Sequence, residues 1–213
     1  MPKHLKRLSD LSREDIEKLL VAAGAFKEHP ELAYDKLAGR SVTMYFSKPS
    51  TRTRISFETA IHRLGGHPIL CRPDDLQLGR GETIEDTARV LSRMSAAFVI
   101  RTFADDDVER FARAATIPVI NALTDGHHPC QALADLLTWR ERFGSFDGLT
   151  VTYVGAGNNV AHSLLEAFAI LHREHPEVLL VLTSGEAQMA GPVTDATAGL
   201  GLTALGACEK PPG

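Results

Sequence analysis

The chain has 213 residues, of which 44% are hydrophobic and 23% are charged, and its formal net charge is −4. This composition is typical of a globular protein with one large or two smaller domains, and the acidic balance argues against nucleic acid as a partner. Three widely spaced cysteines, Cys71, Cys130 and Cys208, indicate a reducing compartment. No signal-peptide core or membrane-length apolar run is present, so we expect a cytoplasmic protein with no membrane partner.

The hydrophobic pattern predicts an N-terminal helix capped by Ser12, followed by strands that alternate with helices. The predicted strands are 41–46, 67–72, 96–102, 117–123, 149–157 and 177–184. The predicted later helices are 50–64, one that begins at Thr83, 107–115, 129–144 and 159–173. Such alternation indicates βαβ units, so we expect an α/β fold with a parallel sheet and helices on both of its faces.

The segment GSFDG, residues 144–148, interrupts this pattern and predicts a hinge between two domains, 1–144 and 149–213. After about residue 184 the sequence becomes rich in Gly, Ala and Pro, and we expect at most a short helix or strand there and a frayed end. A second domain of about 65 residues is small for a doubly wound fold. We therefore expect the second, Rossmann-like α/β domain to be incomplete.

The segment PSTRTR, residues 49–54, stands between a predicted strand and a predicted helix. Ligands of parallel sheets bind beyond the carboxyl ends of the strands, and a helix N-terminus offers free N–H donors to an anion. Arg52 and Arg54 are two residues apart and point in different directions, so one can reach a ligand while the other pairs with a carboxylate. A capped helix with solvated arginines is the alternative interpretation.

Three further polar residues lie at or after the ends of predicted strands. Arg101 follows the apolar residues of strand 96–102, and His128 and Gln131 come after strand 117–123. An imidazole and a carboxamide at a helix start could hold a small carbonyl and an NH₂ group. A zinc site built from His127, His128 and Cys130 is an alternative, but adjacent ligands point apart and no second cluster completes the site. We therefore expect no bound metal.

The segment VGAGNNVAHS, residues 154–163, has the strand–glycine–helix form of a dinucleotide-binding fingerprint. Val160 stands where the third glycine of that fingerprint belongs. A nucleotide-dependent Rossmann enzyme remains an alternative at this point, but we expect no nucleotide cofactor.

Together these segments resemble the aspartate/ornithine carbamoyltransferase family, and within it the ornithine branch. The resemblance covers residues 1 to about 170. It rests on five motifs in the same order: STRTR (50–54), QLGRGETIEDTARVLSRM (77–94), IRTF (100–103), HPCQALADL (128–136) and GNNVAHSL (157–164). The aspartate-specific relatives share STRTR and a similar His-Pro-x-Gln, but they lack the QLGRGE segment and the Asn-Asn turn.

The resemblance implies transfer of the carbamoyl group of carbamoyl phosphate to the δ-amine of L-ornithine, which gives L-citrulline and phosphate in arginine biosynthesis or ornithine metabolism. It implies no cofactor, and a homotrimer in which Gln77 reaches a neighbouring subunit. Arg52, Arg101 and His128 would be catalytic, and Asn159, helped by Asn158, would contact ornithine. The implied carbamoyl-phosphate ligands are Ser50, Thr51, Arg52, Thr53, Gln77, Arg101, His128 and Gln131.

The family's Ser-Met-Gly and His-Cys-Leu-Pro segments, which help to orient ornithine, do not occur in the sequence. We therefore expect a C-terminally truncated chain with a complete carbamoyl-phosphate half-site and only part of the amino-acid half-site. The alternative is a catalytically impaired paralogue that binds carbamoyl phosphate or assembles with full-length subunits.

Overall fold

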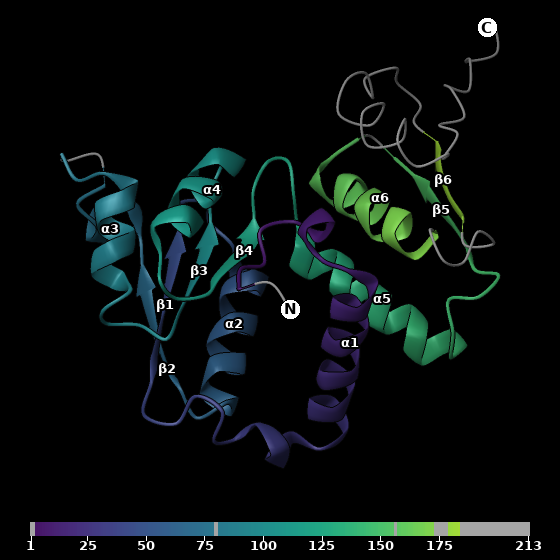
Figure 1. Cartoon of the computed structure of the whole chain (residues 1–213), viewed down its shortest axis with the longest axis horizontal. Coiled ribbons are helices and arrows are strands. Elements are labelled where there is room, and N and C mark those ends of the chain that lie inside the picture. Colours follow the sequence, from purple (N-terminus) through teal and green to yellow (C-terminus); the bar gives the residue numbers. More distant parts are fainter. Residues whose placement is uncertain (1–2, 79–80, 156, 173–178, 184–213) are drawn as a thin grey trace, which may run out of the picture.

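The computed structural model describes residues 3–78, 81–155, 157–172 and 179–183, and this part of the chain contains two parallel sheets (Figure 1). The larger sheet has the strand order β2-β1-β3-β4. Its strands are β1 (Ser41–Phe46), β2 (His67–Cys71), β3 (Ala97–Arg101) and β4 (Val119–Leu123). A separate pair consists of β5 (Thr150–Val154) and β6 (Leu179–Thr183). The predicted parallel α/β fold is therefore confirmed.

The helices fall close to the predicted ranges. They are α1 (Arg13–Glu28), α2 (Thr51–Arg63), α3 (Ile84–Leu91), α4 (Asp105–Ala114), α5 (Pro129–Phe143) and α6 (Asn159–His172). Short 3-10 turns that the hydrophobic pattern did not predict are η1 (Leu8–Asp10), η2 (Pro30–Ala33) and η3 (Pro73–Asp75). The helix or strand expected after residue 184 lies outside the described residues. Within the described ranges, no helix combines the length and apolar character needed to cross a bilayer.

Hydroxyl side chains determine where several helices begin. Ser12 and Asp15 form a reciprocal capping box at α1, and the hydroxyl of Thr83 accepts a hydrogen bond from the Asp86 backbone N–H at α3. Helix α4 begins at Asp105, two residues before the predicted start, and three aspartates occupy its first turn. Negative charge there interacts favourably with the helix dipole, so these polar residues extend the helix beyond its apolar stripe.

The larger sheet is covered on both faces, as the βαβ pattern predicted. Phe98 and Ile100 of β3 pack with α3 and α4, whereas the intervening Val99 packs in the cluster that contains Ile61 of α2. Successive side chains of a strand point to opposite faces, so β3 contributes to both apolar layers. Figure 1 shows α2 and the α3–α4 pair on opposite sides of the strands.

A third apolar cluster joins α1, α5 and α6. Ile16 of α1, Leu136 of α5 and Phe168 of α6 are fully buried in it, together with Leu8 of η1. This cluster therefore contains residues from both sides of the 144–148 segment. The shared core anchors α6 to the N-terminal part of the chain, next to the end of β4.

The strand order reverses between β1 and β3. After β1 the chain passes through α2 to β2 on one side, and it then returns across β1 to β3 and β4 on the other. Loops that leave the carboxyl ends of β1 and β3 therefore diverge in opposite directions, and such switch points are where open parallel sheets bind ligands.

The stacked pair Phe98 and Phe111 should dominate the stability of the larger sheet. Their ring centroids lie 3.9 Å apart, and each side chain is at most 1% exposed. We expect Phe98→Ala to lower the free energy of unfolding by about 3–5 kcal/mol, because it removes a buried ring and leaves a cavity. Urea denaturation measures this loss. Met94→Ala, at a side chain that is 70% exposed, should change the free energy of unfolding by less than about 0.5 kcal/mol. Equal losses in the two variants would contradict the central role of the Phe98–Phe111 pair.

Candidate active site

The carboxyl ends of β1, β3 and β4 surround a pocket of about 440 Å³ at the switch point. Six of the eight predicted carbamoyl-phosphate ligands line it: Ser50, Arg52, Thr53, Arg101, His128 and Gln131. Its remaining lining residues are Ser56, Phe57, Leu123, Cys130 and Ala134. The fold thus brings together side chains that are up to about 80 residues apart in the sequence, because parallel strands end at the same sheet edge.

The β1–α2 turn supplies one wall of the pocket. The hydroxyl of Ser50 accepts a hydrogen bond of 3.3 Å from the Thr53 backbone N–H, so Ser50 is the cap of α2. Arg52 lines the pocket, whereas Arg54 donates to Glu58 over 3.0 Å one turn along the helix. The two arginines therefore separate as their spacing predicted. The helix cap is therefore confirmed, and the capped N-terminus opens on the pocket, so the anion-binding interpretation is compatible with it and stays a prediction.

Arg101 enters the same pocket from the end of β3, where the register of β3 against β4 shifts. Its Nη1 atom donates to the hydroxyl of Thr53 over 3.3 Å. Its Nε atom is buried and has no hydrogen-bond partner among the described residues, and burial lowers the pKa of the guanidinium. A buried donor without a partner costs about 1–3 kcal/mol, so this nitrogen indicates a position where a ligand acceptor belongs.

His128 precedes α5 and faces the pocket beside Arg101. Burial, with a smaller contribution from the nearby Arg101 charge, lowers the pKa of His128 from 6.5 to about 4. The imidazole is therefore neutral at pH 7 and presents one N–H donor. Its Nδ1 atom is buried without a partner among the described residues, while its backbone N–H donates to the Ser163 hydroxyl over 2.8 Å.

Gln131, Thr51 and Gln77 differ in how they relate to this pocket. Gln131 lines the pocket, and its amide nitrogen donates to Asp135 over 3.0 Å. Thr51 lines a second pocket on the other side of the β1–α2 turn. Gln77 is exposed between η3 and α3 and lines neither pocket.

Asn159, the predicted ornithine contact, is the first residue of α6. Its amide nitrogen donates to the backbone carbonyl of Thr124 over 2.7 Å. Asn158 accepts hydrogen bonds from the backbone N–H groups of Val160 and Ala161 through its Oδ1 atom, so it caps the helix. Both asparagines therefore have structural partners, and neither lines the 440 Å³ pocket.

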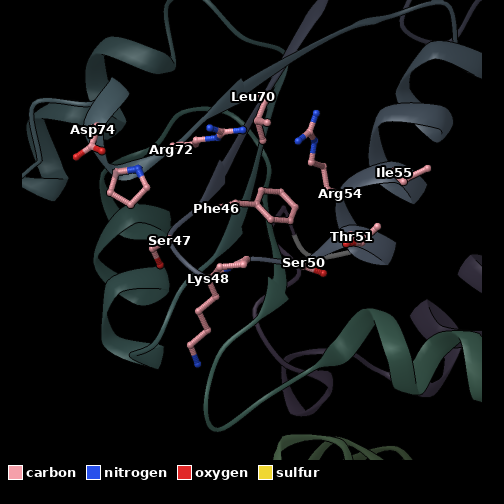
Figure 2. Close-up of a pocket in the computed structure, with 12 residues that line it drawn as sticks. Phe46, Ser47, Lys48, Ser50, Thr51, Arg54, Ile55, Leu70, Arg72 and Asp74 are labelled. Carbon is pink, nitrogen blue, oxygen red and sulfur yellow. The ribbon is translucent and has the colours of Figure 1, made fainter.

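The second pocket has a volume of about 620 Å³ and shares Ser50 with the first. Figure 2 shows Arg54 and Arg72 reaching toward one another across it, and Lys48 pointing away from them. Lys48 pairs with Asp125, and its ammonium lies 4.3 Å from the centre of the Phe103 ring. Lys48 and Arg54 are both paired with carboxylates, and Asp74 also lines the pocket, so cations and anions alternate around it.

The residues of the alternative zinc site have other partners. The two ring nitrogens of His127 contact the carboxylates of Asp105 and Glu166. Burial raises the pKa of the Cys130 thiol to about 12, so this sulfur stays protonated at neutral pH. Among the described residues, no group of three or more His, Cys, Asp or Glu side chains is arranged to hold a metal ion.

Sequence reasoning missed the role of His127 as the link between Asp105 and Glu166. The three residues are far apart in sequence, so local periodicity gives no sign of the contact. One signal was present: polar residues at 159, 162, 163 and 166 share one face of an otherwise apolar predicted helix.

Comparison with known proteins identifies the family. The profile described as aspartate/ornithine carbamoyltransferase, carbamoyl-P binding domain, matches residues 3–141. The chain therefore belongs to the aspartate/ornithine carbamoyltransferase family. Its similar relatives include proteins named ornithine carbamoyltransferase, which agrees with the branch that the motifs favoured.

The protein from Parafrankia sp. is 65% identical over 134 residues, which are 63% of this chain and 42% of the relative. The protein from Acidothermus cellulolyticus is 54% identical over 170 residues, or 80% of this chain and 54% of the relative. The ornithine carbamoyltransferase structure from Burkholderia thailandensis superposes with a TM-score of 0.83 at 40% identity, covering 93% of this chain and 68% of that one. The chain thus spans about half the length of these curated relatives.

The depressed pKa of His128 leads to a prediction for titration. We expect nuclear magnetic resonance to give a pKa of about 4 for His128, and we expect Arg101→Gln to raise it only in part, because burial remains. As the pH falls, His128 takes up its proton in the unfolded chain before it does so in the folded chain. The contribution of His128 should therefore lower the free energy of unfolding progressively as the pH falls from 6.5 to about 4. His128→Gln should remove that component. A His128 pKa near 6.5 would contradict the buried, Arg101-facing placement.

Proposed function

We propose that the 440 Å³ pocket binds carbamoyl phosphate and that the chain supports carbamoyl transfer to the δ-amine of L-ornithine, giving L-citrulline and phosphate. The observation that carries this proposal is the convergence of the α2 N-terminus, Arg101 and His128 on one pocket at the switch point. Two of these groups bring buried nitrogens without partners among the described residues. The ornithine carbamoyltransferase relatives support the choice of reaction.

In this proposal the phosphate lies at the N-terminus of α2. Backbone N–H groups of the first helical turn, the hydroxyls of Ser50 and Thr53, and the guanidinium of Arg52 would donate to its oxygens. Thr51, whose side chain lines the second pocket, would contribute through its backbone N–H group. An anion at this place also interacts favourably with the helix dipole. The same donors would stabilise the phosphate as it leaves with the electrons of the broken C–O bond.

The carbamoyl group would lie between Arg101, His128 and Gln131. The unprotonated δ-amine attacks the carbonyl carbon, the carbonyl oxygen gains negative charge, and the amine then loses a proton as phosphate departs. Arg101 and neutral His128 would donate to this oxygen, and Gln131 would accept from the NH₂ group and fix its orientation. Donors that are already held in place stabilise such an oxyanion without reorganising during the reaction.

The remaining expectations complete this proposal. We assign residues 1–144 to the carbamoyl-phosphate-binding domain and 149–213 to part of the amino-acid-binding domain, where Asn159 would meet ornithine. The family profile over residues 3–141 supports the first of these assignments. A homotrimer would let Gln77 serve a neighbouring pocket, which fits its exposure. We also propose a cytoplasmic location and a role in arginine biosynthesis or ornithine metabolism.

A second candidate function is carbamoyl-phosphate binding with little turnover. The observation that favours it is the lack of Ser-Met-Gly and His-Cys-Leu-Pro segments in the sequence. In the 213-residue chain taken by itself, no such segment would hold the amine in line with the carbamoyl carbon, and most of the rate advantage of proximity would be lost.

Arg52→Ala tests the phosphate site. We expect at least a tenfold loss of affinity for carbamoyl phosphate, because a charge-assisted hydrogen bond contributes about 1.5–3 kcal/mol. Isothermal titration calorimetry with freshly dissolved carbamoyl phosphate measures this change. Arg63→Ala, in the last turn of α2 and outside the pocket, is the matched control and should bind normally. Equal affinities for all three proteins would show that the STRTR turn is only a helix cap.

Citrulline formation separates the two candidate functions. We expect the purified 213-residue chain to bind carbamoyl phosphate but to form little citrulline from it and L-ornithine. A colorimetric citrulline assay, with loss of signal in Arg101→Gln as the control for specificity, measures turnover. Robust turnover by the chain alone would reject the binding-only candidate and support the transferase.

A further inference from the structure

The β4–α5 loop, residues 124–128, carries His128 and is bound along its length to one face of α6. The helix contributes a polar stripe, defined here as Asn159, His162, Ser163 and Glu166. These positions follow the i, i+3, i+4, i+7 pattern, so they form one line on the helix surface. Leu164, Phe168 and Leu171 of the same helix pack in the apolar core, so the polar stripe lies on a different face from the core residues.

Each residue of the stripe contacts a different part of the loop. Asn159 donates to the Thr124 carbonyl over 2.7 Å, and the Nδ1 atom of His162 lies 3.0 Å from the Gly126 carbonyl. Ser163 accepts from the His128 backbone N–H over 2.8 Å. The loop is therefore held by the helix at three backbone positions, and the last of them belongs to the residue that faces the pocket.

His127 supplies the side-chain part of this attachment. Its Nδ1 atom lies 3.0 Å from an Asp105 oxygen, and its Nε2 atom lies 3.5 Å from a Glu166 oxygen. The side chain is buried, and its ring stacks on that of His162 with centroids 4.6 Å apart. One imidazole thus connects the first turn of α4 to the third turn of α6, directly beside His128.

Glu166 is itself fixed by the N-terminal segment. It accepts hydrogen bonds from the backbone N–H groups of Leu8 and Ser9 and from the Ser9 hydroxyl. These contacts hold the carboxylate as an anion, because burial would raise the pKa of Glu166 but the hydrogen bonds with His127 and Ser9 outweigh it. Asp105 is held in the same way by His127 and Thr124.

We propose that His127 is a positioning residue that, by bridging Asp105 and Glu166, locks the β4–α5 loop onto α6 and so aims His128 at the pocket. The bridge is a property of the fold and does not require a ligand. Only the effect of the bridge on ligand binding rests on the proposed function, in which His128 contacts the carbamoyl group.

The bridge depends on the charge of His127. The ionisable and charged groups that face it are Asp105 from α4, Glu166 and His162 from α6, and Arg7, which interacts with Asp105 from the N-terminal segment. Burial alone would lower the pKa of His127, but the hydrogen bonds to both carboxylates outweigh it and raise the pKa to about 9. A raised folded-state pKa stabilises the fold fully below pH 6.5, and this stabilisation is lost as the pH rises through about 9.

Two adjacent histidines therefore have opposite states at neutral pH. His127 is charged and structural, and His128 is neutral and faces the pocket. Loss of the His127 proton would leave the buried Glu166 carboxylate and the partly exposed Asp105 carboxylate without their shared cation. Because an unpaired buried charge is costly, we expect the loop to loosen from α6 so that water reaches Glu166.

The first experiment uses the unliganded wild-type chain, so it does not depend on the proposed function. We expect nuclear magnetic resonance titration to give His127 a pKa well above 6.5, and we expect the His128 amide to exchange at least about tenfold faster at pH 9.5 than at pH 7.5 after correction for intrinsic rates. Glu166→Gln should lower the His127 pKa and abolish the pH dependence. A His127 pKa at or below 6.5, or exchange independent of pH, overturns the inference even if every variant fails to fold.

The second experiment measures positioning through carbamoyl-phosphate affinity by calorimetry between pH 7.5 and 9.5. We expect wild-type affinity to fall toward pH 9.5, and we expect His127→Gln to bind about tenfold more weakly at pH 7.5 with no further fall. His29→Gln, at an exposed histidine of the N-terminal half, is the matched control and should behave as wild type.

The outcomes of the two experiments separate the two proposals. If His127→Gln binds as tightly as wild type, His127 does not position the site. If wild type shows the expected titration and exchange but binds no carbamoyl phosphate, the proposed function fails. The exchange data then still support the His127 bridge.

Discussion

The pairing of β1 with β3 in parallel is the constraint on which the rest of the structure depends. It places Phe46 beside Arg101, so the α2 N-terminus that follows β1 and the guanidinium at the end of β3 open on the same sheet edge. The pairing of β3 with β4 then brings the loop with His128 to that edge. The two apolar layers formed by α2 on one face and α3 and α4 on the other make this register stable, because a slip by one residue would turn Phe98 and Val99 to the wrong faces.

A pocket built in this way concentrates positive charge in a partly buried place. Arg101 lies inside it and Arg52 at its entrance, and burial together with Arg101 keeps His128 neutral. Under the proposed function, a bound anion would balance this charge and supply the hydrogen-bond acceptors that the buried nitrogens lack. The neighbouring His127 has the opposite charge state, because its imidazole lies between the carboxylates of Asp105 and Glu166.

The second part of the chain helps to hold the residues that line the main pocket. Helix α6 shares an apolar core with α1 and α5, and its polar stripe holds the loop that carries His128. The loop that lines the 440 Å³ pocket is therefore held by residues beyond the 144–148 segment. A domain division based on the hinge in the sequence is useful for naming ligand sites, but the packing and the hydrogen bonds cross it.

The sequence alone determined the alternation of strands and helices, the parallel α/β class, and the residues that end β1 and β4, because hydrophobic periodicity and helix caps are local signals. It also determined which residues match the family motifs. Only the tertiary structure decided that Asn159 and Asn158 hydrogen-bond to the backbone, that Thr51 and Gln77 lie outside the main pocket, and that His127 bridges Asp105 and Glu166. These outcomes depend on contacts between segments far apart in the chain, and their burial and charge exist only once those segments have packed together.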